Sequence, residues 1–287
     1  MQNMNKILII GGDSRQQYMA DYFENNGFNV SVYGLPEIKR KCVKDIKTEI
    51  GHSDIIILPL PVTKDNKFIN SQIPIRETMD DIFSCLNKNH YVFAGMIGKG
   101  TEAKMLKKTD KIYDYFKRED LTIKNTIPTV QGILKTIIDN IEYTVHSSKI
   151  AVFGYGRVAK VTADNLFSLG AEVTVCVRKK ADIAAAEIKG LKGCMITEFH
   201  NISHGFDIII NTVPSLVINR EILMNLKTDS LIIDVASAPY GTDFTAAFEL
   251  GLNTIQCPSL PGKVAPKTAG KIIADEIMCI LKEEDHG

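Results

Sequence analysis

Residues 150–159 read IAVFGYGRVA, in which a short apolar run leads into the spacing G-x-G-x-x-A. In such a stretch Gly154 permits a tight turn, Gly156 lets the backbone approach a phosphate closely, and Ala159 lets a following helix pack on the strand. The first turn of that helix offers free N–H groups and the positive end of its dipole to an anion. The stretch therefore predicts a strand, a turn and a helix that bind a pyrophosphate, with contacts from Gly154, Tyr155, Gly156, Arg157 and Val158.

The surrounding residues supply the context that this short motif needs, because glycine-rich turns also occur without ligands. Short β-branched runs alternate with amphipathic stretches, and they predict strands at Lys149–Gly154, Glu172–Val177, Met195–Glu198, Asp207–Asn211, Ser230–Val235 and Asn253–Cys257. Six strands with intervening helices match the topology of a Rossmann dinucleotide-binding domain, which we expect over residues 147–265.

The end of the second of these strands indicates which nicotinamide cofactor binds. NAD-binding domains place an acidic residue there to hold the ribose 2′-hydroxyl. Here Arg178, Lys179 and Lys180 follow the strand, and no acid comes before Asp182. Three cations suit the 2′-phosphate of NADP, so we predict NADP rather than NAD. The alternative is a solvated basic loop that happens to follow a strand.

Loops after the later strands should face the nicotinamide, because ligands bind at the carboxyl ends of parallel strands. These loops contain Thr212, Val213 and Pro214, and then Ala236 and Ser237. Ordinary turn chemistry explains each loop equally well when it is considered singly.

The first half of the chain shows the same alternation. Apolar runs at Lys6–Ile10, Asn29–Tyr33, Ile55–Leu58 and Tyr91–Ala94 predict parallel strands, with helices at Ser14–Asn25, Pro74–Leu86 and Thr101–Lys107. Residues 110–125 are rich in charge and weakly periodic. The fold class is therefore α/β, with two doubly wound parallel-sheet domains: a flavodoxin-like domain over residues 1–125, which we expect to carry the substrate, and the Rossmann domain. Residues 126–146 are expected to form a hinge helix between them. Residues 266–287 form a final helix, for which packing on the first domain is one alternative.

Two segments are candidates for binding an anionic substrate. Ser14 and Arg15 follow Gly11-Gly12-Asp13 at the predicted start of a helix, where N–H groups and a guanidinium can hold a carboxylate. Alternatively, Asp13 or Ser14 is only the helix N-cap. Pro61 and Thr63, after the Ile55–Leu58 strand, are expected to border the same site.

The second segment precedes the final helix and contains Lys263, Lys267 and Thr268. A cation is unfavourable at a helix N-terminus, so Lys267 is better explained if an anion shares the site. Lys267 is a candidate for binding a carboxylate or for acting as the catalytic base. Asp243 is a weaker candidate base, and capping the next helix is the alternative role for it.

Composition excludes several function classes. Lys and Arg total 34, as do Asp and Glu, so no basic field attracts nucleic acid or a membrane surface. No apolar run approaches the roughly 20 residues that cross a bilayer. The six cysteines are scattered without a CxxC pair, and no HExxH stretch is present, so we expect no metal, no disulfide framework and a reducing cytoplasmic compartment.

Several longer motifs resemble those of the dipicolinate synthase A family from spore-forming bacteria, along nearly the whole chain. They are GGDSR at 11–15, IPTVQG at 127–132, VFGYGR at 152–157, the stretch 207–214, GTDF at 241–244 and, most specific of all, LPGKVAPKTAG at 260–270. The layout also resembles the D-2-hydroxyacid and alanine dehydrogenases.

The resemblance implies a function that no spacing could show. It implies NADP-dependent oxidation of dihydrodipicolinate, or of its 4-hydroxytetrahydro precursor, from a branch of the lysine pathway to dipicolinate. It also implies a small cyclic dicarboxylate substrate, a partner in the form of a separate, flavoprotein-like B subunit, and a place in the mother-cell cytoplasm during sporulation. No settled catalytic residue is carried over with it.

Two other functions stay open from the sequence. One is a regulatory subunit that binds NADP and the intermediate but leaves the chemistry to the B subunit, which the lack of a clear acid–base pair favours. The other is a D-2-hydroxyacid dehydrogenase, against which the expected loops hold no convincing Arg, Glu and His set. The oligomeric state is also open, with a homo-oligomer as one alternative.

Overall fold

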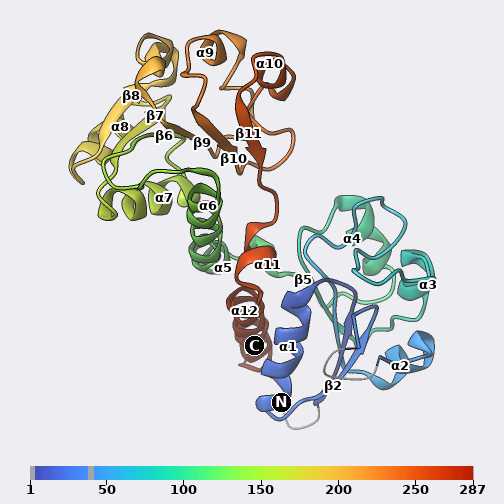
Figure 1. The fold of residues 1–287 in the computed structure, drawn as a ribbon. Coiled ribbons are helices and arrows are strands. Elements are labelled where there is room, and N and C mark those ends of the chain that lie inside the picture. Colours follow the sequence, from blue (N-terminus) through green and yellow to red (C-terminus); the bar gives the residue numbers. More distant parts are fainter. Residues whose placement is uncertain (1–3, 38–41, 287) are drawn as a thin grey trace. The chain divides into compact units, whose positions relative to one another are not determined.

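A computed structural model describes residues 4–37 and 42–286 (Figure 1). The chain divides into two compact units, of which the first contains residues 1–125 and 265–287 and the second contains residues 126–264. Both are built on wholly parallel sheets, which confirms the predicted fold class. Among the described residues, every helix is too short or too polar to cross a membrane.

The first unit has a five-stranded sheet in the order β2-β1-β3-β4-β5, which is the flavodoxin-like order. Its strands are β1 (Lys6–Ile10), β2 (Asn29–Tyr33), β3 (Ile55–Ile57), β4 (Tyr91–Ala94) and β5 (Ile112–Asp114). Its first helices are α1 (Ser14–Asn25), α2 (Ile46–His52), α3 (Met79–Ser84) and α4 (Lys99–Leu106). The charged stretch after α4 supplies β5, the short 3-10 helix η1 (Tyr115–Lys117) and α5 (Glu119–Lys124).

Helix α3 begins five residues later than the expected start at Pro74. The Thr78 side chain accepts a hydrogen bond from the Asp81 N–H, and the Asp81 carboxylate accepts one from the Thr78 N–H. This reciprocal capping box satisfies two N–H groups that a helix start leaves without partners. The capping chemistry therefore places the helix start at Met79.

Both faces of the first sheet are covered. Ile7 and Ile9 of β1 belong to one apolar cluster, and Leu8 and Ile10 belong to a second. This alternation explains why the strand is apolar throughout, since successive side chains of a strand point to opposite faces.

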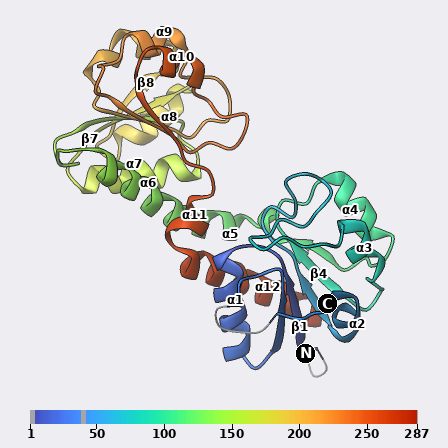
Figure 2. The ribbon, with the colours of Figure 1, turned by 45° about the vertical axis from the view of Figure 1, so that its right-hand side comes forward.

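The final helix, α12 (Pro266–His286), belongs to the first unit. It lies beside α1, as both ribbon views show (Figures 1 and 2). Its Ile273 and Ile277 share the apolar cluster of Ile7 and Phe23. At the polar edge, Arg118 donates to Glu276 at 2.7 Å and to Glu283 at 2.6 Å. The first unit is therefore completed by a segment that follows the second unit in the sequence.

The second unit has a six-stranded sheet in the order β11-β10-β9-β6-β7-β8, which is the Rossmann order. Its strands are β6 (Lys149–Phe153), β7 (Glu172–Val177), β8 (Lys192–Met195), β9 (Ile208–Asn211), β10 (Leu231–Asp234) and β11 (Asn253–Gln256). Its helices are α6 (Thr126–Asn140), α7 (Arg157–Ser168), α8 (Lys180–Glu187), α9 (Arg220–Met224), α10 (Phe244–Glu249) and α11 (Leu260–Val264), with 3-10 turns η2 (Ile196–Asn201) and η3 (Ser203–Gly205).

Helix α6, expected as a hinge, is an integral part of the second unit. Its Ile133 and Ile137 are fully buried in the same cluster as Val152 of β6. Gly132 of α6 lies so close to Leu260 of α11 that an added Cβ would approach the Leu260 Cβ to 2.8 Å. Helices α6 and α11 therefore pack tightly against each other within this unit.

Candidate active site

The strand order of the second sheet reverses between β6 and β9, so the loops after these strands diverge. Ligands of open parallel sheets bind outside the carboxyl ends of the strands at such a switch point. The loops are held in place by Thr212, whose hydroxyl donates to the Phe153 carbonyl oxygen at 2.7 Å. The residues after β6 and β9 thus form the candidate cofactor site.

The two glycines of the fingerprint have different roles in this site. Gly154 has a φ of +98°, and an added Cβ would lie 2.6 Å from the Thr212 hydroxyl oxygen, so the fold itself requires glycine. Gly156 has an ordinary φ of −79° at the N-cap of α7, and an added Cβ would meet no atom within 4 Å. Because the protein leaves open space at Gly156, the need for glycine there is best explained by a bound pyrophosphate.

This difference leads to a prediction for Gly156→Ala. The variant should fold with a free energy of unfolding within about 1 kcal/mol of the wild-type value, since only a helix N-cap changes. Its dissociation constant for NADP should rise about 10-fold or more, because a methyl group enters the space next to the helix N-terminus. Calorimetric titration alongside thermal unfolding measures both, and unchanged NADP affinity would contradict the pyrophosphate assignment.

The other fingerprint residues divide between core and surface. The Tyr155 ring is buried, with its hydroxyl 3.4 Å from the Ala185 carbonyl oxygen and the Lys160 Nζ 5.1 Å from the ring centre. Burial raises the pKa of Tyr155. The side chain of Val158 packs against the core cluster, whereas Arg157 is exposed in the first turn of α7. The fingerprint therefore offers one guanidinium and the helix N-terminus to a ligand, and the Tyr155 side chain serves the core.

The basic segment after β7 is fully on the surface. Arg178, Lys179 and Lys180 are all exposed, and Lys179 is the N-cap of α8 without a side-chain cap bond. The first acid of this turn is Asp182, inside α8. The structure thus places three cations beyond the end of β7, where a 2′-phosphate would lie.

A buried carboxylate that the sequence motifs did not indicate links the loops after β9 and β10. Asp234 ends β10 and is fully buried, and it accepts hydrogen bonds from Asn211, Gly241 and Thr242. Thr212, Val213 and Pro214 lie in one of the linked loops, and Ala236 and Ser237 lie in the other. An Asp at the end of an apolar strand was the signal that could have identified it.

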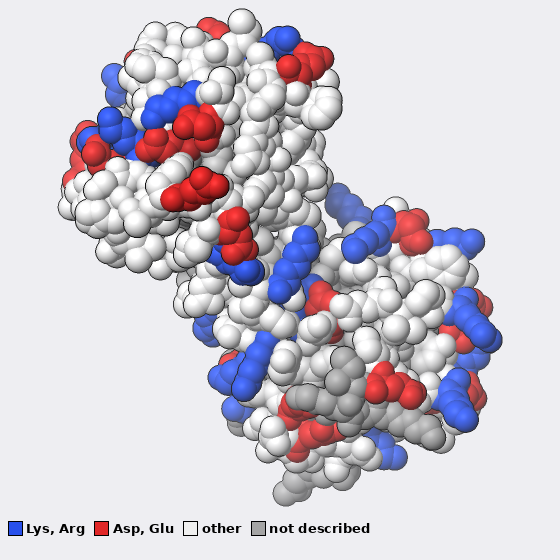
Figure 3. All heavy atoms as spheres, viewed as in Figure 1, with Lys and Arg blue, Asp and Glu red and all other residues white. Residues whose placement is uncertain are grey.

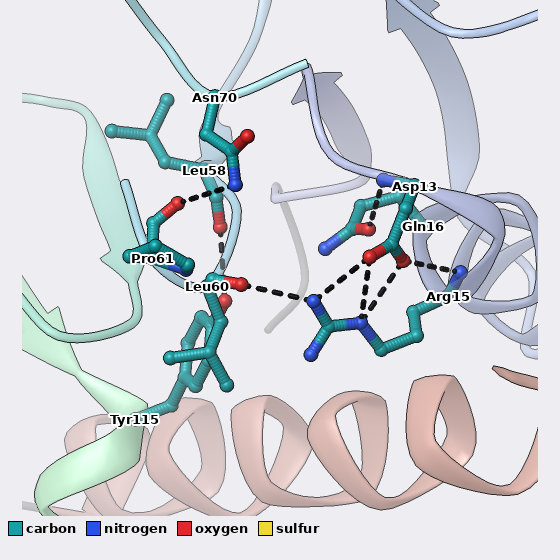
Figure 4. A network of polar contacts seen from close by, with 8 residues as sticks. All are labelled: Asp13, Arg15, Gln16, Leu58, Leu60, Pro61, Asn70 and Tyr115. Atoms are coloured by element: carbon teal, nitrogen blue, oxygen red, sulfur yellow. Dashed lines mark hydrogen bonds and ion pairs between the residues drawn. The ribbon is translucent and has the colours of Figure 1, made fainter. Parts of the chain in front are cut away.

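The strand order of the first sheet reverses between β1 and β3, and a second polar network lies there (Figure 4). Asp13 is the N-cap of α1, and the side chain of Gln16 completes a capping box with it. The Arg15 Nη2 donates to the Asp13 carboxylate and to the Leu60 carbonyl oxygen, both at 2.9 Å. Arg15 thereby joins the loop after β1 to the loop after β3.

The electrostatics of this network follow from the Asp13–Arg15 pair. Burial acts to raise the pKa of Asp13, but the hydrogen bonds and positive charge of Arg15 outweigh it and lower that pKa below its usual value. Asp13 is therefore ionised at neutral pH and orients the guanidinium. The Gln16 amide nitrogen is buried without a hydrogen-bond partner in the described chain. An unpaired buried donor is costly, so Gln16 is a further polar group at this switch point that the sequence motifs did not reveal.

The start of α12 lies beside the start of α1. An added Cβ on Gly270 would approach the Arg15 carbonyl oxygen to 2.4 Å, so only glycine allows this contact. Lys267 and Thr268 occupy the exposed first turn of α12. Two helix N-termini therefore lie together at one edge of the first unit, an arrangement that favours an anion.

The remaining predicted substrate residues serve local structure. The Thr63 hydroxyl accepts a hydrogen bond from the Asn66 N–H at 3.0 Å and closes a tight turn, and the Pro61 carbonyl oxygen accepts one from Asn70. Lys263 is exposed on α11, within the second unit, and Ser14 is the half-buried first residue of α1.

Asp243 has the structural role that was the alternative to catalysis. Its side chain accepts a hydrogen bond from the Ala246 N–H at 2.9 Å and caps α10. A carboxylate in this position stabilises the helix start, so the assignment of Asp243 as catalytic base is withdrawn.

Comparisons with known proteins identify the family. The chain is 32% identical over 285 residues to the A subunit of dipicolinate synthase from Bacillus subtilis, and the alignment covers 97% of this chain and 96% of that protein. Residues 6–116 match the family model for the N-terminal domain of the same dipicolinate synthase component. The chain belongs to the dipicolinate synthase A family. The resemblance found in the sequence motifs is thus confirmed.

Solved structures of dipicolinate synthase A proteins share the whole fold. The protein from Bacillus halodurans has a TM-score of 0.86 at 29% identity, covering 96% of this chain and 97% of that chain. The protein from Bacillus subtilis has a TM-score of 0.85 at 32% identity, covering 99% and 98%. An L-alanine dehydrogenase shares the fold alone, at 14% identity and a TM-score of 0.62, covering 96% and 88%.

The second unit of this dipicolinate synthase A protein is a nucleotide-binding domain of the dehydrogenase type. Residues 144–278 match the model described as acetohydroxy acid isomeroreductase, NADPH-binding domain. This match and the dehydrogenase-like fold support a nicotinamide cofactor. In the part of the chain that the structure describes, no three His, Cys, Asp or Glu side chains gather as a metal site requires.

Charge is evenly spread over the surface of this family member. Lys and Arg side chains are interspersed with Asp and Glu on the face that Figure 3 shows, in agreement with equal totals of 34 each. Any anion must therefore be bound by local groups such as Arg178 in the second unit and Arg15 in the first.

Proposed function

We propose that this protein is an NADP-dependent oxidoreductase that converts dihydrodipicolinate, or its 4-hydroxytetrahydro precursor, to dipicolinate. The dihydro ring loses one hydride and one proton and becomes aromatic, and the 4-hydroxy precursor also loses one water. NADP supplies the hydride acceptor. Aromatisation drives the reaction, so the protein has mainly to orient the ring and remove the proton.

One observation carries this proposal: a member of the dipicolinate synthase A family contains two separate anion-binding arrangements, one on each sheet. The second unit presents the N-terminus of α7 and the basic segment Arg178–Lys180, which suit a dinucleotide with a 2′-phosphate. The first unit presents Arg15 and the paired starts of α1 and α12, which suit a carboxylate. Oxidation of a dicarboxylate by NADP requires both.

The chain's own residues have the following proposed roles. Arg15 binds one carboxylate, with Ser14 and Thr268 as neutral donors near the two helix starts, and Pro61 and Thr63 shape the adjoining loop. Lys267 binds the second carboxylate or removes the ring proton, and Lys263 adds positive charge. Thr212, Val213, Pro214, Ala236 and Ser237 contact the nicotinamide half of the cofactor.

Family membership supports the remaining parts of the proposal. The partner is a flavoprotein-like B subunit, and the protein acts in the mother-cell cytoplasm of a sporulating bacterium. A second candidate function is a regulatory subunit that binds NADP and the intermediate while the B subunit performs the chemistry. The exposed position of Lys267 and the capping role of Asp243 favour it, because neither forms an acid–base pair with a neighbour.

Hydride transfer by this protein in isolation separates the two candidates. Purified protein is mixed with NADP and dihydrodipicolinate generated enzymatically, and NADPH formation is followed at its absorbance maximum with and without a B subunit. Formation of NADPH and dipicolinate without the B subunit supports the oxidoreductase. NADP binding without turnover unless the B subunit is added supports the regulatory function.

Cofactor preference gives a prediction for Arg178→Ala. The wild-type protein should bind NADPH more tightly than NADH, and the variant should lose about 10-fold of that preference, or about 1.4 kcal/mol, because one charge-assisted contact to the 2′-phosphate is removed. Fluorescence titration with both nucleotides measures the ratio. Lys192→Ala is the matched control, since Lys192 is an exposed cation of the same unit that pairs with Glu172 at 2.9 Å. An equal loss in both variants would contradict the site.

A further inference from the structure

The strongest buried polar cluster that the proposed reaction leaves unexplained surrounds Asp234. Its side chain is 0% exposed at the carboxyl end of β10. One oxygen accepts a hydrogen bond from the Ala236 N–H at 3.0 Å. The other accepts from Asn211 Nδ2 at 2.9 Å, the Gly241 N–H at 3.0 Å and the Thr242 hydroxyl at 2.8 Å. All four donors are neutral, which is an expensive way to hold a buried charge if packing were the only purpose.

Asn211 extends this cluster to the neighbouring strand. Its Nδ2 also donates to the Val213 carbonyl oxygen at 3.0 Å, and its Oδ1 accepts from the Val213 N–H at 3.0 Å. Asn211 therefore holds the backbone of the loop after β9 on one side and Asp234 on the other. The two side chains together link residues 212–215 to residues 236–242.

The two loops are also in direct backbone contact. An added Cβ on Gly241 would lie 2.4 Å from the Val213 carbonyl oxygen and 2.7 Å from the Ser215 carbonyl oxygen. The Gly241 carbonyl oxygen accepts hydrogen bonds from Val217 and Ile218, each at 2.9 Å. The loops thus approach as closely as glycine permits, and Asp234 binds the N–H of that glycine.

We propose that Asp234, through Asn211 and Gly241, is the positioning residue that holds the loops after β9 and β10 as one rigid surface for the nicotinamide half of the cofactor. The inference rests on the proposed function, because the carboxyl ends of these strands are where a Rossmann domain receives the nicotinamide. The adenosine half binds at the other side of the switch point, after β6 and β7. Asp234 therefore acts on one half of the cofactor and not on the other.

The decisive variant is Asp234→Asn, which keeps the size of the side chain but replaces one acceptor oxygen by an NH2 group facing N–H and O–H donors. Titrations compare NADP with adenosine 2′,5′-bisphosphate, which lacks the nicotinamide half. We expect the dissociation constant for NADP to rise about 10-fold or more and that for the bisphosphate to change less than about 2-fold. Equal weakening of both ligands, or no change in either, would overturn the inference.

A readout independent of the cofactor is hydrogen exchange of the unliganded protein. Asp234→Asn should speed amide exchange in residues 212–215 and 236–242 and leave β7 and the start of α7 unchanged. Thr242→Val removes a single donor and should produce the same pattern more weakly, which keeps the test valid if Asp234→Asn does not fold. Unchanged exchange in both loops would overturn the inference even if the wild-type protein bound NADP. If the wild-type protein bound neither ligand, the proposed function would fail while the exchange result still decided the role of Asp234.

Discussion

Arg15→Ala is expected to lower kcat/KM for the cyclic dicarboxylate by about 100-fold, or about 3 kcal/mol, with little change in the affinity for NADP. The guanidinium is nearly buried and is held by Asp13 and by the Leu60 carbonyl oxygen, so it is already oriented before a carboxylate arrives. Loss of an oriented, charge-assisted contact of this kind costs several kcal/mol, and each 1.4 kcal/mol is a factor of ten. Steady-state kinetics with the B subunit present, together with NADP titration, measure the two effects.

Two variants make the Arg15 prediction specific. Arg15→Lys keeps the charge but loses the planar fork that contacts both Asp13 and Leu60, so we expect an intermediate loss of activity. Arg220→Ala is the matched control, because Arg220 is an exposed arginine of the second unit paired with Glu249. Activity of Arg15→Ala close to that of Arg220→Ala would remove the carboxylate site from the first unit. Unfolding curves of each variant separate this loss from a loss of folded protein.

Ile277→Ala is expected to lower the free energy of unfolding of the first unit by about 2–5 kcal/mol, the usual cost of truncating a fully buried isoleucine. Ile277 of α12 is 0% exposed and packs in the same cluster as Ile7, Phe23 and Phe93, far from it in the sequence. Hydrogen exchange should therefore rise in β1 and α1, whereas β6 and β9, which have core clusters of their own, keep their protection. Denaturant unfolding and exchange mass spectrometry measure these effects.

The control for this prediction is Ile138→Ala on α6. Ile138 is 62% exposed, so its truncation should change the free energy of unfolding by less than about 0.5 kcal/mol. If Ile277→Ala were equally harmless, or if it exposed β6 as much as β1, then α12 would not be part of the first unit.

The residues whose effect is local could be assigned from the sequence. The turn at Gly154, the helix that follows it and the cations after β7 need only a strand, a turn and their neighbours in the chain. The apolar runs likewise predicted two parallel sheets, because strands covered on both faces are apolar throughout. The family motifs, which extend over most of the chain, indicated the correct family.

The sequence could not separate the alternatives that depend on a partner far along the chain or on the local backbone of a folded loop. Asp243 had two open roles, and the hydrogen bond to the Ala246 N–H decided for the helix cap. Arg15 could have been a free surface cation, and its bond to Leu60, 45 residues away, shows that it joins two loops.

The sequence by itself determined the two doubly wound sheets, the phosphate-binding turn at Gly154 and the basic segment at Arg178, since each depends on periodicity or on adjacent residues. Only the tertiary structure decided that α12 completes the first unit and that Asp234 links the loops after β9 and β10. The physical reason is that a buried side chain acquires its role from the donors and apolar surfaces that folding brings to it. Those partners come from strands and helices whose order in space is not their order in the chain.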